Sequence, residues 1–291
     1  MRPVGRLRRP ERGGPGGGNG GATSSLVPIL LYHSVSADDG GPLHPYTMAP
    51  ARFRAHMAWI AEQRRSTMTV SEYAAVLRGE AALPDRPLVV TFDDGYADVF
   101  GAAAVMIEYG IRATLYVTTA PIGETRRGTL AGRPMLSWSE LRELHDAGVE
   151  IGAHSHDHVQ LDLLPRRAMT HQVTVCKHLL QDRVQAQIGS FAYPHGYHSR
   201  RVREAVQAAG YGSACAVKNA LSHPRDDPWA LGRVMLERDD TVERLRAVCE
   251  DGVHPLSWRG ERPLTRGWRV VRRVRTSLRP GTLTPPTTPG T

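Results

Sequence analysis

Two short polar clusters in this chain of 291 residues contain side chains that can bind metals and transfer protons. The first cluster, T-F-D-D-G at 91–95, places Asp93 and Asp94 directly after an apolar run at 87–90. Adjacent side chains diverge at the end of a strand, so one carboxylate could bind a metal while its neighbour accepts a proton from water. Both could instead cap the segment that follows. The pair alone is therefore weak evidence for a site.

The second cluster, H-S-H-D-H at 154–158, follows a second apolar run. His154 and His158 could converge on one cation if the loop between them coils into a turn. Two histidines with one carboxylate form a common catalytic zinc set. His156 and Asp157 are interpreted as exposed loop residues, with a role in orienting the ligands as the alternative. Together the two clusters predict a divalent metal site. Zn²⁺ is the expected ion, with Co²⁺, Ni²⁺ or Fe²⁺ as alternatives.

The elements that must position these clusters can be predicted from the hydrophobic pattern. Strands are expected at 28–35, 88–92, 113–118, 149–153, 189–193 and 212–217, and helices at 51–63, 71–78, 97–109, 137–147, 166–187 and 201–209. Alternating strands and helices indicate an α/β fold with a parallel sheet covered by helices. Because the polar clusters follow several different strands, a closed or distorted (β/α) barrel is favoured over an open sheet.

The net charge of +8 is concentrated at the two ends of the chain. Residues 1–25 contain five arginines and one glutamate, and residues 259–291 contain eight arginines and one glutamate. We therefore expect a mildly acidic domain at 26–258, a disordered Gly/Arg-rich tail at 1–25, and a basic, then Pro/Thr-rich tail at 259–291. This distribution argues against nucleic-acid binding by the domain. Weak contact of the tails with anionic surfaces remains open.

Segments that would place the chain in a membrane or export pathway are not visible in the sequence. No apolar run approaches the roughly 20 residues of a transmembrane helix. The run 26–32 is too short for a signal-peptide core, so a cytoplasmic location is expected unless export uses another signal. Cys176, Cys215 and Cys249 lie far apart, which favours buried free thiols over a disulfide framework or a thiolate zinc site.

Taken together, the two clusters resemble motifs of the polysaccharide deacetylase family (NodB homology, carbohydrate esterase family 4). The family motifs T-F-D-D-G and H-[ST]-x-x-H are both intact, and the resemblance covers roughly residues 27–250. It implies a distorted (β/α) barrel in which Asp93 is the catalytic base. Asp94, His154 and His158 would be the metal ligands.

The third family motif, R-x-P-x-G, is only partly kept, as A-Y-P-H-G at 192–196. Ala192 replaces an arginine that orients the base in the family, which predicts a less secure position for Asp93. His195 takes the place of an aromatic residue whose backbone N–H helps to bind the oxyanion. A backbone donor does not depend on the side chain, so this role could persist at His195, with Tyr193 and Pro194 in the same turn.

The form F-A-Y-P-x-G resembles one branch of the family, the deacetylases of exported β-1,6-linked N-acetylglucosamine polymers. In that branch the general-acid histidine comes from an early L-x-Y-H segment, which matches residues 30–33. A late L-x-x-H motif is missing, so His33 is the expected acid. The alternative is a strand-end histidine whose nitrogens are satisfied by backbone groups.

The resemblance implies metal-dependent removal of an acetyl group from an N-acetylated sugar, with release of acetate. The substrate would be an N-acetylglucosamine-type polysaccharide, an oligosaccharide or a precursor. One alternative is hydrolysis of another linear amide or C–N bond on the same scaffold. A second alternative, suggested by Ala192, is a sugar-binding protein whose site has decayed.

Overall fold

The computed structural model describes residues 26–38, 40–125 and 128–250, and its centre is an eight-stranded sheet. The strand order is β11-β10-β9-β6-β5-β1-β12, and β4 pairs with β5 outside this path. All of these pairs are parallel. The strands are β1 (Ile29–Tyr32), β4 (Ser66–Met68), β5 (Pro87–Phe92), β6 (Ala113–Val117), β9 (Glu150–Ala153), β10 (Ser190–Ala192), β11 (Ser213–Cys215) and β12 (Val234–Met235). Two further two-stranded sheets are formed by β2 (Ser34–Val35) with β3 (Thr47–Met48), and by β7 (Thr129–Leu130) with β8 (Arg133–Pro134).

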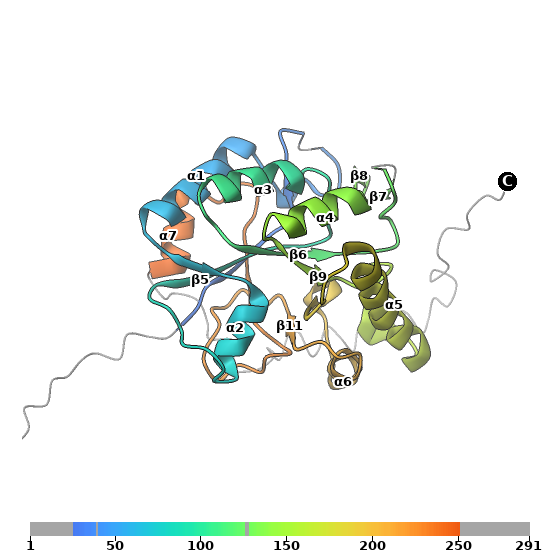
Figure 1. The fold of residues 1–291 in the computed structure, drawn as a ribbon. Helices are drawn as coiled ribbons and strands as arrows, with labels where there is room; N and C mark the ends of the chain where they lie inside the picture. Colours follow the sequence, from blue (N-terminus) through green and yellow to red (C-terminus); the bar gives the residue numbers. More distant parts are fainter. Residues whose placement is uncertain (1–25, 39, 126–127, 251–291) are drawn as a thin grey trace, which may run out of the picture.

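The helices lie on the outer face of the curved sheet, except for α2, which lies on the opposite face (Figure 1). They are α1 (Pro50–Glu62), α2 (Val70–Leu77), α3 (Val99–Glu108), α4 (Trp138–Asp146), α5 (Arg166–Val184), α6 (Arg200–Ala208) and α7 (Val242–Glu250). Three short 3-10 turns occur at η1 (His44–Tyr46), η2 (Leu161–Leu163) and η3 (Pro194–Gly196). The parallel strands curl into a half-barrel, so the predicted distorted (β/α) barrel is confirmed.

The core follows the alternation of side chains along each strand. Leu30, Val90 and Leu115 belong to a large apolar cluster that includes the inward faces of most helices. Ile29 and Val89 belong to a smaller cluster on the opposite face of the sheet, to which α2 also contributes side chains. The strands that precede the two polar clusters are therefore buried on both faces.

All six predicted strands and all six predicted helices are present, with ends that differ by a few residues. The first predicted strand, 28–35, is interrupted at His33, which separates β1 from β2. The sequence did not predict β3, β4, β7, β8, β12 or α7. Each of these strands has only two or three residues, too few for a period to be visible. The predicted tails at 1–25 and 259–291 lie outside the described residues.

Two further expectations concern membranes and cysteines. Within the part of the chain that the structure describes, no helix combines the length and the apolar character needed to cross a bilayer. Cys176 and Cys215 are buried free thiols, as predicted, while Cys249 is partly exposed.

Candidate active site

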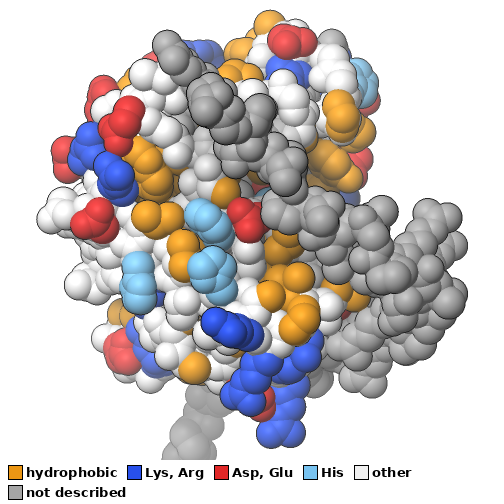
Figure 2. All heavy atoms as spheres, turned by 90° about the vertical axis from the view of Figure 1, so that its right-hand side faces the viewer, with side chains coloured by type: hydrophobic (Ala, Val, Ile, Leu, Met, Phe, Trp, Pro, Cys, Tyr) orange, Lys and Arg blue, Asp and Glu red, His pale blue; other side chains and the backbone are white. Residues whose placement is uncertain are grey.

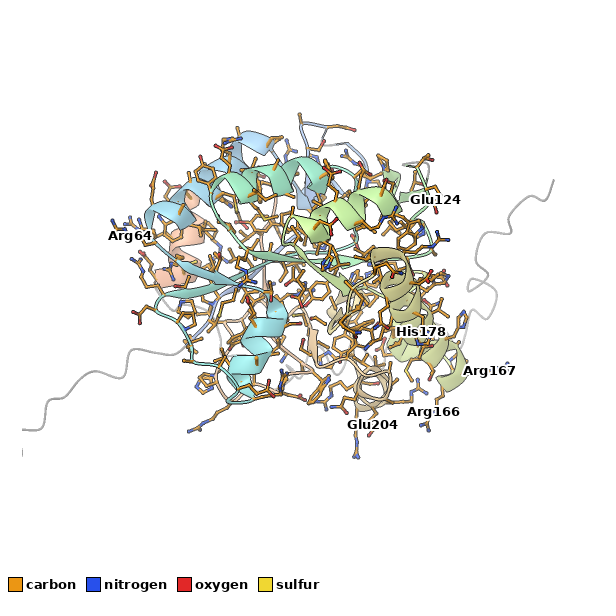
Figure 3. The ribbon with its side chains drawn as sticks, in the orientation of Figure 1. Arg64, Glu124, Arg166, Arg167, His178 and Glu204 are labelled. Atoms are coloured by element: carbon orange, nitrogen blue, oxygen red, sulfur yellow. The ribbon has the colours of Figure 1, made fainter. Side chains whose placement is uncertain are left out.

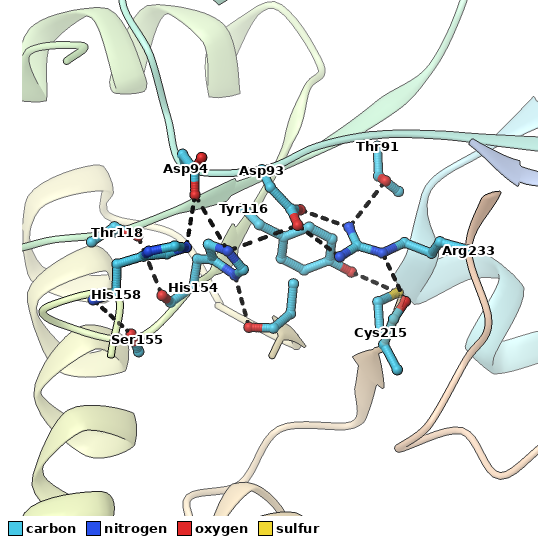
Figure 4. A network of polar contacts seen from close by, with 12 residues as sticks. Thr91, Asp93, Asp94, Tyr116, Thr118, His154, Ser155, His158, Cys215 and Arg233 are labelled. Carbon is cyan, nitrogen blue, oxygen red and sulfur yellow. Dashed lines mark hydrogen bonds and ion pairs between the residues drawn. The ribbon is translucent and has the colours of Figure 1, made fainter. Parts of the chain in front are cut away.

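The predicted site residues meet because parallel strands end at a common edge of the sheet. Tyr32 of β1 lies beside Phe92 of β5, and Ala153 of β9 lies beside Phe191 of β10. The polar residues that follow these strand ends are therefore neighbours, although they come from distant parts of the sequence. Figure 4 shows the resulting network of polar contacts.

Three candidate metal ligands converge on one point. They are Asp94, His154 and His158, together called the metal-binding group. Oδ1 of Asp94 is 3.4 Å from Nε2 of His154 and 3.1 Å from Nε2 of His158 (Figure 4). One donor atom of each residue lies within 4.8 Å of the other two. Asp94 and His154 are buried, whereas the side chain of His158 is 19% exposed. The group is therefore open to solvent on the side of His158.

Contacts behind the histidines fix their orientation. Nδ1–H of His154 donates to the carbonyl oxygen of Ala192 at 2.8 Å, which leaves Nε2 to face Asp94. The Oγ of Ser155 accepts a hydrogen bond from the backbone N–H of His158 at 3.1 Å. The bond at Nδ1 of His154 sets the tautomer and direction of its imidazole, whereas the bond of Ser155 holds the backbone at His158. Ala192 thus contributes to the site through its backbone carbonyl, which holds the ring of His154.

The backbone bends sharply at the site residues themselves. Asp94, Ser155 and His158 have φ values of 75°, 66° and 55°, in the left-handed region that residues other than glycine seldom adopt. At the first bend, the carbonyl of Asp94 accepts a hydrogen bond from the backbone N–H of Thr118 at 3.1 Å. This bend directs the carboxylates of Asp93 and Asp94 towards different partners.

The charges of this group fit a divalent cation. Oδ1 of Asp94 is buried, and the two imidazoles approach it without hydrogen-bond geometry, so it has no hydrogen-bond partner among the described residues. Burial alone would raise the pKa of Asp94, but His154 and His158 hold it well below the usual value. An ionised carboxylate oxygen that faces two ring nitrogens is consistent with a divalent metal site.

Asp93 is held by an arginine that the sequence analysis missed. Arg233 donates from Nη1 to Oδ1 at 2.6 Å and from Nη2 to Oδ2 at 2.7 Å, and both residues are buried (Figure 4). Ala192 had predicted a less secure position for Asp93. That expectation is wrong, because Arg233, which directly precedes β12, supplies a bidentate guanidinium. The available signal was a single charged residue inside the apolar stretch L-G-R-V-M at 231–235.

This pair also sets the charge of Asp93. Burial favours the neutral acid, but the charges of Arg233 and His154 outweigh it and lower the pKa of Asp93. His154 responds in the opposite sense: burial disfavours its charged form, yet Asp93 and Asp94 raise its pKa. Asp93 is therefore an ionised carboxylate beside the metal-binding group, which is the form that a base requires.

His33 lies between β1 and β2, half-buried, with its ring centroid 5.2 Å from that of Tyr46. Burial lowers its pKa, and the charges of Asp94 and Asp93 act against this shift. Its buried Nδ1 has no hydrogen-bond partner among the described residues. The alternative of a histidine satisfied by backbone groups therefore finds no support at this nitrogen.

The third motif reaches the site through His195. This residue has a φ of 58°, is exposed, and places its ring centroid 4.7 Å from that of His158. Tyr193 and Pro194 are buried, and the hydroxyl of Tyr193 donates to the carbonyl of Trp229 at 2.8 Å. The side chains of Tyr193 and Pro194 thus pack into the protein, and only that of His195 extends towards the metal-binding group.

Histidine side chains gather at the centre of the face shown in Figure 2, with arginine or lysine side chains below them. A cavity of about 340 Å³ lies elsewhere, between α5 and α6, and its lining includes Arg166, Thr170 and Arg201 but none of the predicted site residues. Arg166 and Glu204, which also lines this cavity, lie on the outer surface of these helices (Figure 3). We take the metal-binding group, and not this cavity, as the candidate active site because titratable residues converge there.

The fold and the site define a NodB-type half-barrel with an Asp-His-His candidate metal centre at the carboxyl ends of its strands. The polysaccharide deacetylase family model matches residues 80–214 of this chain, which agrees with the resemblance of its sequence motifs to that family. YxkH of Bacillus subtilis (strain 168), which carries a provisional polysaccharide deacetylase name, is 26% identical over 209 residues, or 72% of this chain and 70% of YxkH.

Solved structures support the fold. The Streptococcus pyogenes deacetylase PplD, determined in complex with acetate, has a TM-score of 0.69 at 19% identity, covering 78% of this chain and all of PplD. IcaB from Ammonifex degensii has a TM-score of 0.68 at 22% identity, covering 77% of this chain and 97% of IcaB. At these identities the likeness concerns the fold alone.

Proposed function

We propose that this protein is a metal-dependent deacetylase that removes the acetyl group from an N-acetylated sugar and releases acetate. The observation that carries the proposal is an Asp-His-His group next to an ionised Asp93 held by Arg233. The match to the polysaccharide deacetylase family model supplies the reaction class. The branch resemblance favours an N-acetylglucosamine-type polysaccharide, oligosaccharide or precursor.

Asp94, His154 and His158 would hold the metal, and two imidazoles with one carboxylate favour Zn²⁺. When bound, the ion supplies a Lewis acid that polarises the acetyl carbonyl and lowers the pKa of a water.

Asp93 would take a proton from the attacking water. Its Oδ2 lies 3.8 Å from Nε2 of His154, so the carboxylate faces the metal-binding group as well as Arg233. A carboxylate has about four lone-pair sites, and the guanidinium occupies two of them. Asp93 can therefore remain paired with Arg233 and still accept a proton.

His33 would protonate the departing amine, which cannot leave as an amide anion. Burial opposes the charged imidazole, while the two carboxylates nearby favour it. The proton that Asp93 takes from water can restore His33 after the amine has left. A backbone N–H in the turn at His195 would stabilise the negative charge that develops on the acetyl oxygen.

The direct test uses the purified full chain, freed of metal with a chelator and reloaded with Zn²⁺, Co²⁺, Ni²⁺ or Fe²⁺. We expect acetate release from N-acetylglucosamine oligomers only in a metal-loaded sample. Asp93→Asn should bind metal normally but lose turnover. Ammonia from ureides or imides without acetate from sugars would favour the other C–N substrate class. Sugar binding without stoichiometric metal would favour a decayed site.

A further inference from the structure

The guanidinium of Arg233 is bonded around its edge by three different groups. Besides Asp93, its Nη1 donates to Oγ1 of Thr91 and its Nε to the carbonyl of Ala216, both at 3.2 Å. These bonds lie in the plane of the guanidinium and leave its two faces without hydrogen bonds, as its geometry requires. What lies against a face therefore decides whether the plane can tilt.

The guanidinium of Arg233 lies over the ring of Tyr116. The Cζ of Arg233 is 5.5 Å from the centroid of this ring, and both side chains are fully buried (Figure 4). A cation over an aromatic face is attracted to it, most strongly when both are shielded from water. Tyr116 belongs to β6, the neighbour of the strand that carries Asp93.

Tyr116 is itself held in place. Its hydroxyl lies 2.6 Å from Oγ of Ser190 on β10 and 3.4 Å from Sγ of Cys215 on β11. Gly152 is its register partner on β9, and a Cβ at Gly152 would come within 2.5 Å of the Tyr116 ring. The ring thus occupies space that any larger residue at 152 would fill, and it is anchored to two further strands.

We propose that Tyr116 is a positioning residue: its ring supports the guanidinium of Arg233 in the plane from which it grips both oxygens of Asp93. Tyr116 touches neither substrate nor metal ligand in this scheme and acts only through Arg233. The inference rests on the proposed role of Asp93 as the base. Tyr116, a residue of β6 outside the three family motifs, would thus help to set the position of Asp93.

The test compares Tyr116→Phe, which keeps the ring, with Tyr116→Leu, which removes it. We expect Tyr116→Phe to retain kcat within about twofold, and Tyr116→Leu to lose about 10- to 100-fold in kcat with little change in KM, because the base is misplaced while binding is intact. Metal stoichiometry should stay unchanged in both variants. Tyr116→Met gives the same comparison if the leucine variant does not fold.

Tyr73→Leu is the matched control. Tyr73 is also buried, and its hydroxyl donates to a serine, Ser222, at 2.9 Å, but it belongs to α2, and its hydroxyl bonds neither Arg233 nor Asp93. This variant should lose stability without losing kcat. A similar fall in kcat in Tyr73→Leu would show that the effect of Tyr116→Leu is merely structural.

A second readout does not depend on activity. The Nε–H NMR signal of Arg233, assigned by its absence in Arg233→Lys, should carry a ring-current shift that persists in Tyr116→Phe and disappears in Tyr116→Leu. An unchanged signal and kcat in Tyr116→Leu would overturn the proposal, as would equal damage from Tyr116→Phe. If the wild-type protein releases no acetate, the proposed function fails, while this signal still decides the role of Tyr116.

Discussion

Asp93 and Asp94 are identical side chains at adjacent positions, and their surroundings suit them to the different tasks proposed for them. Asp93 is paired with a guanidinium, whereas Asp94 faces two imidazoles. The left-handed conformation of Asp94 separates the two directions. The motif letters alone predicted a function for both residues. The charge environment that makes each suitable for its role became visible only in three dimensions.

Removing the guanidinium should expose how strongly the site depends on it. Arg233→Ala leaves a buried carboxylate without its partner, and we expect a loss of about 3–5 kcal/mol in the free energy of unfolding together with a large fall in kcat. Arg233→Lys keeps the positive charge but loses the planar guanidinium. Its kcat should therefore lie between that of the wild type and that of Arg233→Ala. Urea unfolding and acetate release measure these effects. A stability loss in Arg233→Ala of below about 1 kcal/mol would contradict the prediction.

At the scale of elements, the sequence pattern predicted every strand that precedes a motif and the helices that follow these strands. It failed at β12, because a two-residue strand has no readable period. The failure extended to the site, since Arg233 directly precedes β12 and lies 140 residues from Asp93. The polar residues of the first two motifs lie within five positions of each other, at 91–95 and at 154–158, whereas the distant pair of Asp93 and Arg233 leaves no local pattern.

The turn of η3 should be intolerant of a side chain at Gly196. Its φ is 72°, and a Cβ would come within 2.7 Å of Val217. Gly196→Ala should therefore cost about 1–3 kcal/mol in the free energy of unfolding and lower acetate release by displacing His195. Gly101→Ala is the control, because this position in α3 has open space around it and should gain about 0.5–1 kcal/mol. Equal effects of the two variants in urea unfolding would refute this expectation.

His56 of α1 links two other parts of the fold. Its Nδ1 accepts from the hydroxyl of Tyr32 on β1, and its Nε2–H donates to the carbonyl of Asp240 before α7, both at 3.0 Å. Burial lowers the pKa of His56, while the Asp240 carbonyl opposes the shift. The stability that neutral His56 contributes should be complete above the unfolded-state pKa of about 6.5, and lost as the pH falls through the lower folded-state pKa.

This pH dependence can be isolated with His56→Gln. Urea unfolding of the metal-free protein between about pH 7.5 and 5 should show a loss of stability in the wild type that is smaller in the variant. His33, whose pKa is also lowered, is present in both proteins, so the difference between them reports His56. Parallel curves for the two proteins would rule out this contribution.

For the whole molecule, the metal-binding group joins the loops after β5 and β9, which are separate elements of the sheet. An ion that binds only the folded chain should add about 2.7 kcal/mol of stability at 100 times its Kd. Zn²⁺ should therefore raise Tm in calorimetry, and a chelator should reverse the change. His158→Ala should lose most of this response. A Tm that neither Zn²⁺ nor chelator alters would argue against the site.

The position of Arg233 also determines when the site is completed during synthesis. Asp93 leaves the ribosome 140 residues before Arg233, a delay of roughly 7–28 s at about 5–20 residues per second. By then both histidines of the metal-binding group have been made. In the growing chain, the base therefore has no guanidinium partner until β12 is added alongside β1, the first strand of the sheet. We therefore expect turnover only after the sheet has received β12, its last strand among the described residues.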